Sequence, residues 1–158
     1  MLSKLITAAI VLFTFQSNMF AQLPTKYVLT QWAAHKIMDE ALQLAKTLNA
    51  PGGSIAIVDD AGTVVLLERL DGTFTKASEV SIAKAQTAAL FKKETKFFED
   101  KINSDRPALI TVGPNMLKGG VPVVYKGQVI GAIGVSGTAS ADQDVQLAEA
   151  GAKAVLDN

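Results

Sequence analysis

The sequence contains no cysteine and only one histidine, His35, among its 158 residues. The lack of cysteine excludes disulfide bonds and thiolate ligands to a metal ion. A single histidine leaves too few ligands for a zinc site built from protein side chains alone. We therefore expect the stability of the protein to come from a packed core and from oligomerisation.

An excess of charge is also lacking, because 15 basic residues face 15 acidic ones. This balance argues against the basic surface that nucleic-acid binding needs and against a polybasic membrane surface. Catalytic motifs are lacking as well. Gly131, Gly134 and Gly137 do not have the spacing of the dinucleotide fingerprint, and no serine lies in a nucleophile elbow. The sequence therefore predicts a protein that is not an enzyme. The alternative, an enzyme that acts on small hydroxy acids, has no set of residues behind it.

The N-terminus, residues 1–21, has the layout of a secretory signal peptide. Lys4 precedes an apolar stretch from Leu5 to Phe15, and Ala21 stands at a suitable cleavage edge. The apolar stretch is shorter than the roughly 20 residues that a membrane span needs. We expect an exported protein, periplasmic or secreted, with residues 22–158 as a single domain and no membrane span after cleavage. An uncleaved anchor is the alternative.

A glycine-rich stretch from Gly119 to Gly137 has the pattern of a β-hairpin. The β-branched run 121–125 is one strand, 126–128 is the turn, and 129–135 is the return strand. Gly131 and Gly134 inside the return strand cost stability unless another backbone packs close to them. We therefore predict a central strand pair, with a helix or a ligand against its glycines.

The remaining chain alternates helical and extended patterns. Apolar residues three or four apart predict an amphipathic helix that follows Thr30, a second helix capped by Ser78, and a last helix opened by Ser140. Extended patterns predict two further strands and a short candidate strand; these cover residues 54–59, 63–70 and 108–112. Tight turns between the strands favour an antiparallel sheet covered by helices, a mixed α/β (α+β) class.

His35 is the first candidate for chemistry. On a helical wheel it lies on the flank of the apolar stripe, which centres near Ala41. It is a candidate ligand for a metal or a heme iron, and a surface imidazole is the alternative. Met38 lies one turn further on and cannot reach the opposite face of the same iron. Met116 and Tyr125 are more distant candidates.

Lys84 and Thr87 are three residues apart and so share one side of the second helix. Lys84 could pair with a propionate, a phosphate or a carboxylate, and a solvated or ion-paired lysine is the alternative. The backbone N–H groups of Gly119 and Gly120 could hold an anion, although tight turns explain these glycines equally well.

Several segments resemble the GlcG/HbpS heme-binding family of small bacterial proteins. They fall in the family's order with suitable gaps and span most of the chain after residue 21. The matching segments are residues 55–62, 81–89, 119–122, 127–137 and 143–144.

The resemblance implies a profilin-like three-layer α/β/α fold with a five-stranded antiparallel sheet, homo-oligomers and, in several members, binding of heme or a related tetrapyrrole. On this hypothesis His35 coordinates iron and Lys84 meets a propionate. Thr87, Gly119 and Gly120 complete the candidate cofactor site, with Met38, Leu42 and a neighbouring subunit as apolar walls. The alternative is a cofactor-free oligomeric accessory or scaffold protein linked to small-acid metabolism.

Overall fold

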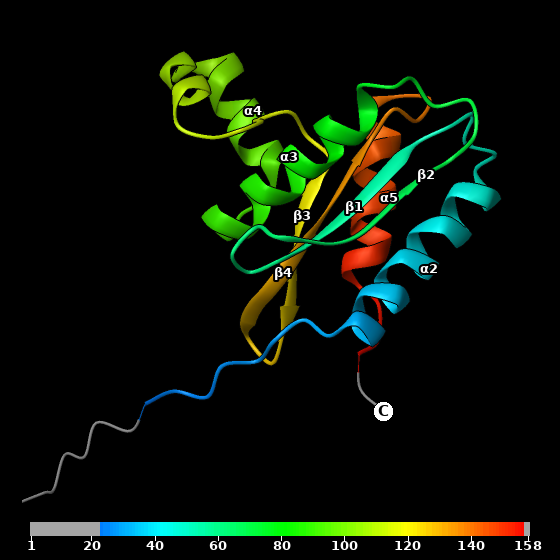
Figure 1. Ribbon diagram of the computed structural model, residues 1–158. Helices are drawn as coiled ribbons and strands as arrows, with labels where there is room; N and C mark the ends of the chain where they lie inside the picture. The colour runs from blue at the N-terminus through cyan, green and yellow to red at the C-terminus, as the bar shows by residue number, and fades with distance from the viewer. Residues whose placement is uncertain (1–22, 157–158) are drawn as a thin grey trace, which may run out of the picture.

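The computed structural model describes residues 23–156, so the predicted signal peptide lies outside the described residues. The described helices pack around one sheet (Figure 1). The elements are α2 (Gln31–Thr47), β1 (Ser54–Asp59), β2 (Val64–Arg69), α3 (Ala77–Phe91), α4 (Thr95–Ser104), the 3₁₀ helix η1 (Pro107–Thr111), β3 (Gly120–Tyr125), β4 (Gln128–Ser136) and α5 (Ala141–Ala152).

The described strands form one antiparallel sheet of four strands in the order β2-β1-β4-β3. The mixed α+β class is thus confirmed, but the expectation of five strands is wrong for the described chain. The short strand predicted at residues 108–112 is largely the 3₁₀ helix η1 instead. Its residues are exposed or half-buried, so they offer no apolar face for a sheet to bury, and Pro107 suits the first turn of a helix.

The predicted hairpin is confirmed, with β3 and β4 joined at Lys126 and Gly127. Its position in the sheet differs from the prediction, because β4 is central while β3 is an edge strand. The edge position suits Pro122, which has no N–H group for a sheet ladder. The Gly120 N–H donates to Thr95 Oγ1 rather than to β4. Residues two apart share an orientation, so the nitrogen of Pro122 also faces away from β4.

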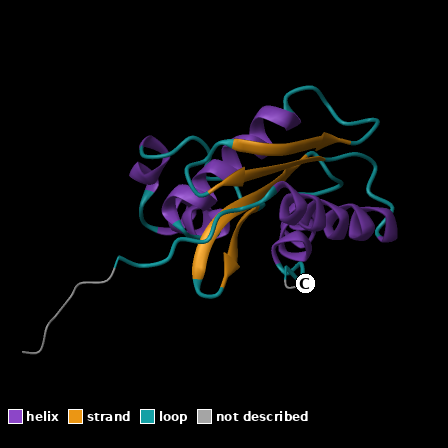
Figure 2. Ribbon diagram, turned by 60° about the horizontal axis from the view of Figure 1, so that its bottom comes forward, coloured by secondary structure: helices purple, strands orange, loops and turns teal. Residues whose placement is uncertain are grey.

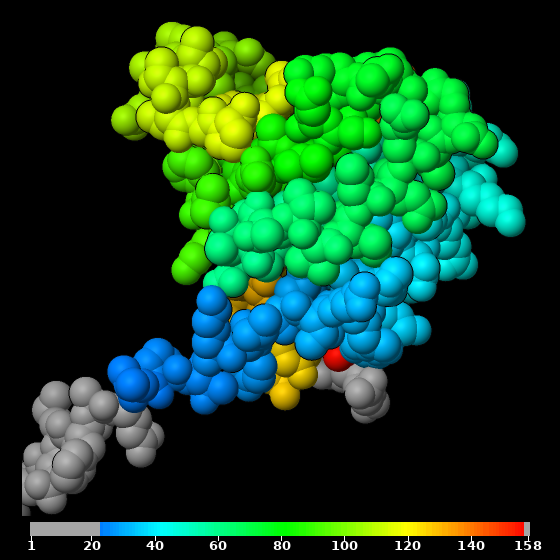
Figure 3. Space-filling view, viewed as in Figure 1, coloured from blue at the N-terminus to red at the C-terminus, as the bar shows by residue number. Residues whose placement is uncertain are grey.

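Helices cover both faces of the sheet (Figure 2). One face carries large aliphatic side chains, which pack with α2 and α5; they include Ile55, Ile57, Ile133 and Val135. The other face carries small residues against α3; they include Ala56, Ala132 and Gly134. The helices α4 and η1 follow α3 on that side and project from the body of the protein (Figure 3). The small residues allow α3 to lie closer to the sheet than a helix over large side chains.

Two of the three predicted helix caps are confirmed. The side chain of Thr30 accepts a hydrogen bond from Ala33 N, and that of Ser140 accepts one from Gln143 N. The cap predicted at Ser78 is wrong, because α3 begins at Ala77 with Lys76 as its N-cap. The Ser78 hydroxyl instead accepts a hydrogen bond from the buried Ser54 hydroxyl.

The segment before α2 lies along the tip of the hairpin (Figure 3). The Gln128 amide accepts a hydrogen bond from Tyr27 N at 3.2 Å and donates one to Thr25 O at 2.7 Å. The rings of Tyr27 and Tyr125 meet edge to face, with centroids 5.1 Å apart. Tyr125, which the sequence offered as a less favoured ligand candidate, therefore helps to hold the segment before α2 against the hairpin.

The cross-strand pair Gly120 and Gly134 is the place where α3 meets the sheet. A Cβ atom at Gly134 would overlap the carbonyl oxygen of Ser81, and one at Gly120 would overlap that of Lys84. The prediction of a close backbone is thus confirmed at Gly134, and the close backbone is that of α3. At Gly131 the close neighbour is the Val58 carbonyl of the adjacent strand.

Alanine substitutions at Gly134 and Gly127 should show that steric overlap with α3 costs more stability than backbone strain alone. Gly134→Ala should lower the free energy of unfolding by about 3 kcal/mol, because a rigid backbone must move. Gly127→Ala is the control: its new Cβ meets nothing within 4 Å, and its φ of 78° costs only about 1 kcal/mol. Urea denaturation measures both, and equal losses would contradict the close approach.

Candidate functional site

The structure places the candidate residues in different layers. His35 lies on the exposed side of α2, whereas Lys84 and Thr87 lie on α3, across the sheet. Gly119 and Gly120 lie beside Lys84. The structure therefore brings Lys84 together with the two glycines but leaves His35 apart from all of them.

Lys84 is buried, with 3% of its side chain exposed, and forms an ion pair inside the protein. Its Nζ lies 3.0 Å from Asp144 Oδ2 and donates to the Val135 carbonyl oxygen at 2.9 Å. A propionate could reach this ammonium group only by displacing Asp144. The geometry therefore favours the ion-paired alternative for Lys84.

Asp144, in the first turn of α5, completes this buried polar cluster. Its Oδ1 accepts hydrogen bonds from Thr138 N at 3.2 Å and from Thr138 Oγ1 at 2.7 Å. A Cβ atom at Gly119 would stand 3.0 Å from Lys84 Nζ, so the glycine leaves room for the ion pair. Lys84 and Asp144 thus connect α3 and α5, which lie on opposite faces of the sheet. Sequence reasoning missed this pairing, although both residues belong to the segments that carry the family resemblance.

Thr87 and Gly120 also hold parts of the chain together. The buried Thr87 hydroxyl accepts a hydrogen bond from Asn115 N at 3.3 Å and so fixes the loop after η1. The Gly120 N–H, which we considered for an anion, donates to the Thr95 hydroxyl at 2.8 Å. These contacts anchor the loop and α4 to the sheet.

His35 stands on what we call the α2 surface, formed by Trp32, His35 and Lys36. Trp32 lies one turn before His35 with 44% of its surface exposed. Lys36 Nζ lies 5.9 Å from the centroid of the indole ring. Leu42 is half-buried, whereas Met38 is 2% exposed and packs in the core. Met38 therefore cannot form the heme wall that the sequence suggested.

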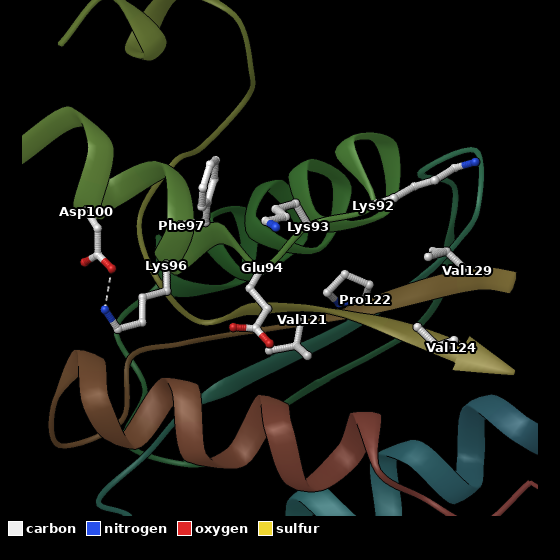
Figure 4. Close-up of a pocket in the computed structure, with 10 residues that line it drawn as sticks. All are labelled: Lys92, Lys93, Glu94, Lys96, Phe97, Asp100, Val121, Pro122, Val124 and Val129. Carbon is white, nitrogen blue, oxygen red and sulfur yellow. Dashed lines mark hydrogen bonds and ion pairs between the residues drawn. The ribbon is translucent and has the colours of Figure 1, made fainter. Parts of the chain in front are cut away.

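A cleft of about 520 Å³ opens between the α3–α4 turn, α4 and the hairpin (Figure 4). Basic, acidic and apolar side chains line it together, and we call it the lysine cleft. Its lining residues are Lys92, Lys93, Glu94, Lys96, Phe97, Asp100, Val121, Pro122, Val124 and Val129. These side chains include carboxylate partners but no imidazole, thiol or thioether for a heme iron. Sequence reasoning missed the cleft because its parts come from three separate segments.

Met116, another distant candidate, borders a second cleft of about 450 Å³ between α4 and residues 113–117. Among residues 23–156, no group of three or more histidine, cysteine, aspartate or glutamate side chains is placed to hold a metal ion. Within the same residues, no helix combines the length and apolar character that crossing a membrane would require.

Together, these features define a small α+β protein whose four-stranded antiparallel sheet is enclosed by helices and tied by a buried Lys–Asp pair. The family model described as "Haem degrading protein HbpS-like" matches residues 29–153. The chain belongs to this HbpS-like family, which confirms the resemblance.

Curated and solved relatives agree with this assignment. The chain is 43% identical to Protein GlcG of Escherichia coli (strain K12) over 115 residues, which are 72% of this chain and 85% of GlcG. A double mutant of Streptomyces reticuli HbpS shares 32% identity and a TM-score of 0.75, covering 86% of this chain and 92% of that one. A PduOC:Heme complex, at 24% identity and a TM-score of 0.72 over 82% of this chain and 96% of that one, shows the same fold.

Removal of the Lys84 ammonium group should strongly destabilise the protein. Lys84→Met leaves the buried Asp144 carboxylate without its ion-pair partner, with only the Thr138 hydrogen bonds remaining, which costs about 3–5 kcal/mol of unfolding free energy. Lys84→Met combined with Asp144→Leu should recover much of this loss. Lys153→Met is the control, since its ion pair with Glu149 is exposed and contributes about 0.5 kcal/mol or less. Urea midpoints at neutral pH measure all three, and a Lys84→Met loss no larger than the control's would contradict a structural pair.

Proposed function

We propose that this protein binds heme or a related tetrapyrrole at the α2 surface, with His35 as the iron ligand. One observation carries the proposal: the only histidine of this HbpS-like chain is exposed to solvent on α2, beside an exposed tryptophan. Bound heme would supply an iron centre there. The family's description, which names heme, supports the choice of ligand.

The α2 surface has the chemistry that heme needs. A neutral imidazole is a common axial ligand of heme iron. Trp32 and His35 are three residues apart on one side of the helix, so the indole offers apolar surface next to the ligand. Lys36 lies near the same ring and can pair with a propionate. The lysine cleft fits heme less well, because its described side chains include no imidazole, thiol or thioether to bind the iron.

Oligomerisation belongs to the same proposal. Ligand sites are usually concave and bury most of the ligand, whereas His35 stands on an exposed helix surface. A second copy of the chain can supply the missing wall on the other side of the porphyrin. We therefore propose that heme is held between two copies and that heme binding favours self-association.

Export and a non-enzymatic role complete the proposal. Export rests on the signal-peptide pattern of residues 1–21. The binding role rests on the sequence, which contains none of the catalytic motifs considered above. Incubation of the heme-loaded protein with ascorbate tests this role. We expect the Soret band to persist, and bleaching with release of a linear tetrapyrrole would contradict a purely binding function.

A cofactor-free accessory protein is the second candidate. It is favoured by the finding that Lys84, Thr87, Gly119 and Gly120 make contacts within the protein that hold its elements together. On this alternative, His35 is a surface residue and the protein acts through contacts with other proteins of small-acid metabolism.

Titration of residues 22–158 with hemin distinguishes the two candidates. A saturable, sharpened Soret band at about one heme per two chains is expected, because each heme would lie between two copies. His35→Ala should abolish the sharpened band and weaken binding at least about tenfold, through loss of the axial ligand. Gln43→Ala, at an exposed position further along α2, is the matched control.

Two outcomes would count against the proposal in different ways. A His35→Ala protein with the wild-type spectrum would contradict the ligand assignment. A wild-type spectrum that stays that of free hemin would contradict heme binding and support the accessory role.

A further inference from the structure

We propose that the lysine cleft is a separate binding site for an amphipathic monocarboxylate, such as a medium-chain fatty acid. The cleft combines an uncovered apolar floor with ammonium groups that have no carboxylate partner. It lies on the α3 side of the sheet, whereas the α2 surface belongs to the other helical layer (Figures 1 and 4). The proposal therefore does not depend on heme binding.

The floor of the cleft is a part of the sheet that α3 does not cover. The helix ends at Phe91, and Lys92 adopts a left-handed conformation with φ 52° that turns the chain towards α4. This turn leaves Pro122, Val124 and Val129 facing the cleft. Val124 is 55% exposed although it belongs to a strand. Covering such a surface with an apolar ligand removes apolar area from water and is therefore favourable.

Three lysines stand at the cleft, and two of them lack a carboxylate partner. Lys96 Nζ lies 2.5 Å from Asp100 Oδ2, so its charge is balanced within α4 (Figure 4). Lys93 Nζ lies 4.8 Å from the centroid of the Phe97 ring. Among residues 23–156, neither Lys92 nor Lys93 forms an ion pair. Figure 4 shows their ammonium groups towards different ends of the cleft, Lys93 on the side of Phe97 and Lys92 on the side of Val129. Each is available to an anion at its own end of the apolar floor.

Glu94 limits the charge that the ligand can carry. Its carboxylate lines the same cleft, next to Val121 in Figure 4. With Lys96 and Asp100 balanced, the cleft keeps one positive charge in excess. One carboxylate group neutralises that excess, whereas a phosphate or a dicarboxylate would place a second negative charge near Glu94 and Asp100. The charge pattern therefore selects a ligand with a single carboxylate.

The size of the cleft agrees with a small ligand. Its volume of about 520 Å³ falls within the roughly 300–1,000 Å³ that is usual for small-molecule sites. An alkyl chain can lie along Pro122 and Val124 while its carboxylate meets Lys92 or Lys93 at one end of the cleft. The specificity should thus combine chain length, from the floor, with charge, from the two lysines.

Octanoate and its uncharged analogue 1-octanol test this inference, by two-dimensional ¹H–¹⁵N NMR on residues 22–158. Octanoate should cause saturable shifts confined to the amides of residues 92–97 and 121–129. Octanol, which lacks the carboxylate, should bind at least about tenfold more weakly. Shifts centred on the α2 surface, or equal affinities for the two probes, would overturn the proposal.

Variants separate the role of charge from that of the fold. Lys92→Met combined with Lys93→Met should weaken octanoate binding about tenfold and leave octanol binding unchanged. Val124→Asp should abolish octanoate binding, because it places a negative charge on an exposed part of the floor. Lys46→Met, an exposed lysine on α2, is the matched control and should bind as the wild type does.

Two further outcomes would overturn the proposal of a monocarboxylate site. One is unchanged octanoate affinity in the double lysine variant while the spectrum shows a folded protein. The other is a shift of the same amides on dilution without octanoate, because a second copy of the chain would then cover the cleft.

Discussion

The direct contact between α3 and the sheet at Gly120 and Gly134 is the constraint on which the rest of the structure depends. Side chains at these positions would lift the helix away from β3 and β4. At this short distance, the Lys84 side chain can pass Gly119 and meet Asp144 at the start of α5. One close approach therefore fixes the helix on one face of the sheet and, through an ion pair, a helix on the other face.

Local signals in the sequence predicted much of the fold. Thr30 and Ser140 were recognised as helix caps because each side chain needs only a backbone N–H group three residues further on. Gly134 indicated a close backbone because a glycine weakens a strand unless a neighbour packs against it. The prediction at Ser78 was wrong because the hydroxyl bonds to Ser54, which is distant in the sequence. The fifth strand was wrong because the residues after Pro107 form a 3₁₀ helix whose side chains are exposed or half-buried, so they have no apolar face for a sheet to bury.

The candidate sites were less predictable, since they depend on contacts between separate segments. The helical wheel placed His35 on the flank of α2, and the structure leaves it exposed. Met38 was proposed as a heme wall because its side chain is apolar, although its helical spacing with the other apolar residues carries it into the core. Asp144 was not identified as the partner of Lys84, because 60 residues separate them. The lysine cleft needs the α3–α4 turn, α4 and the hairpin together, and no local pattern shows that assembly.

The outward edge of β3 has a further consequence for how copies of the protein can meet. An exposed strand edge invites another strand to add to the sheet, which leads to open-ended fibres. Here the first outward N–H, that of Gly120, is taken by Thr95, and Pro122 has none to offer. A bulge follows between Val123 and Val124. This edge is thus protected against strand addition, so a second copy that approached it would have to make contact through side chains.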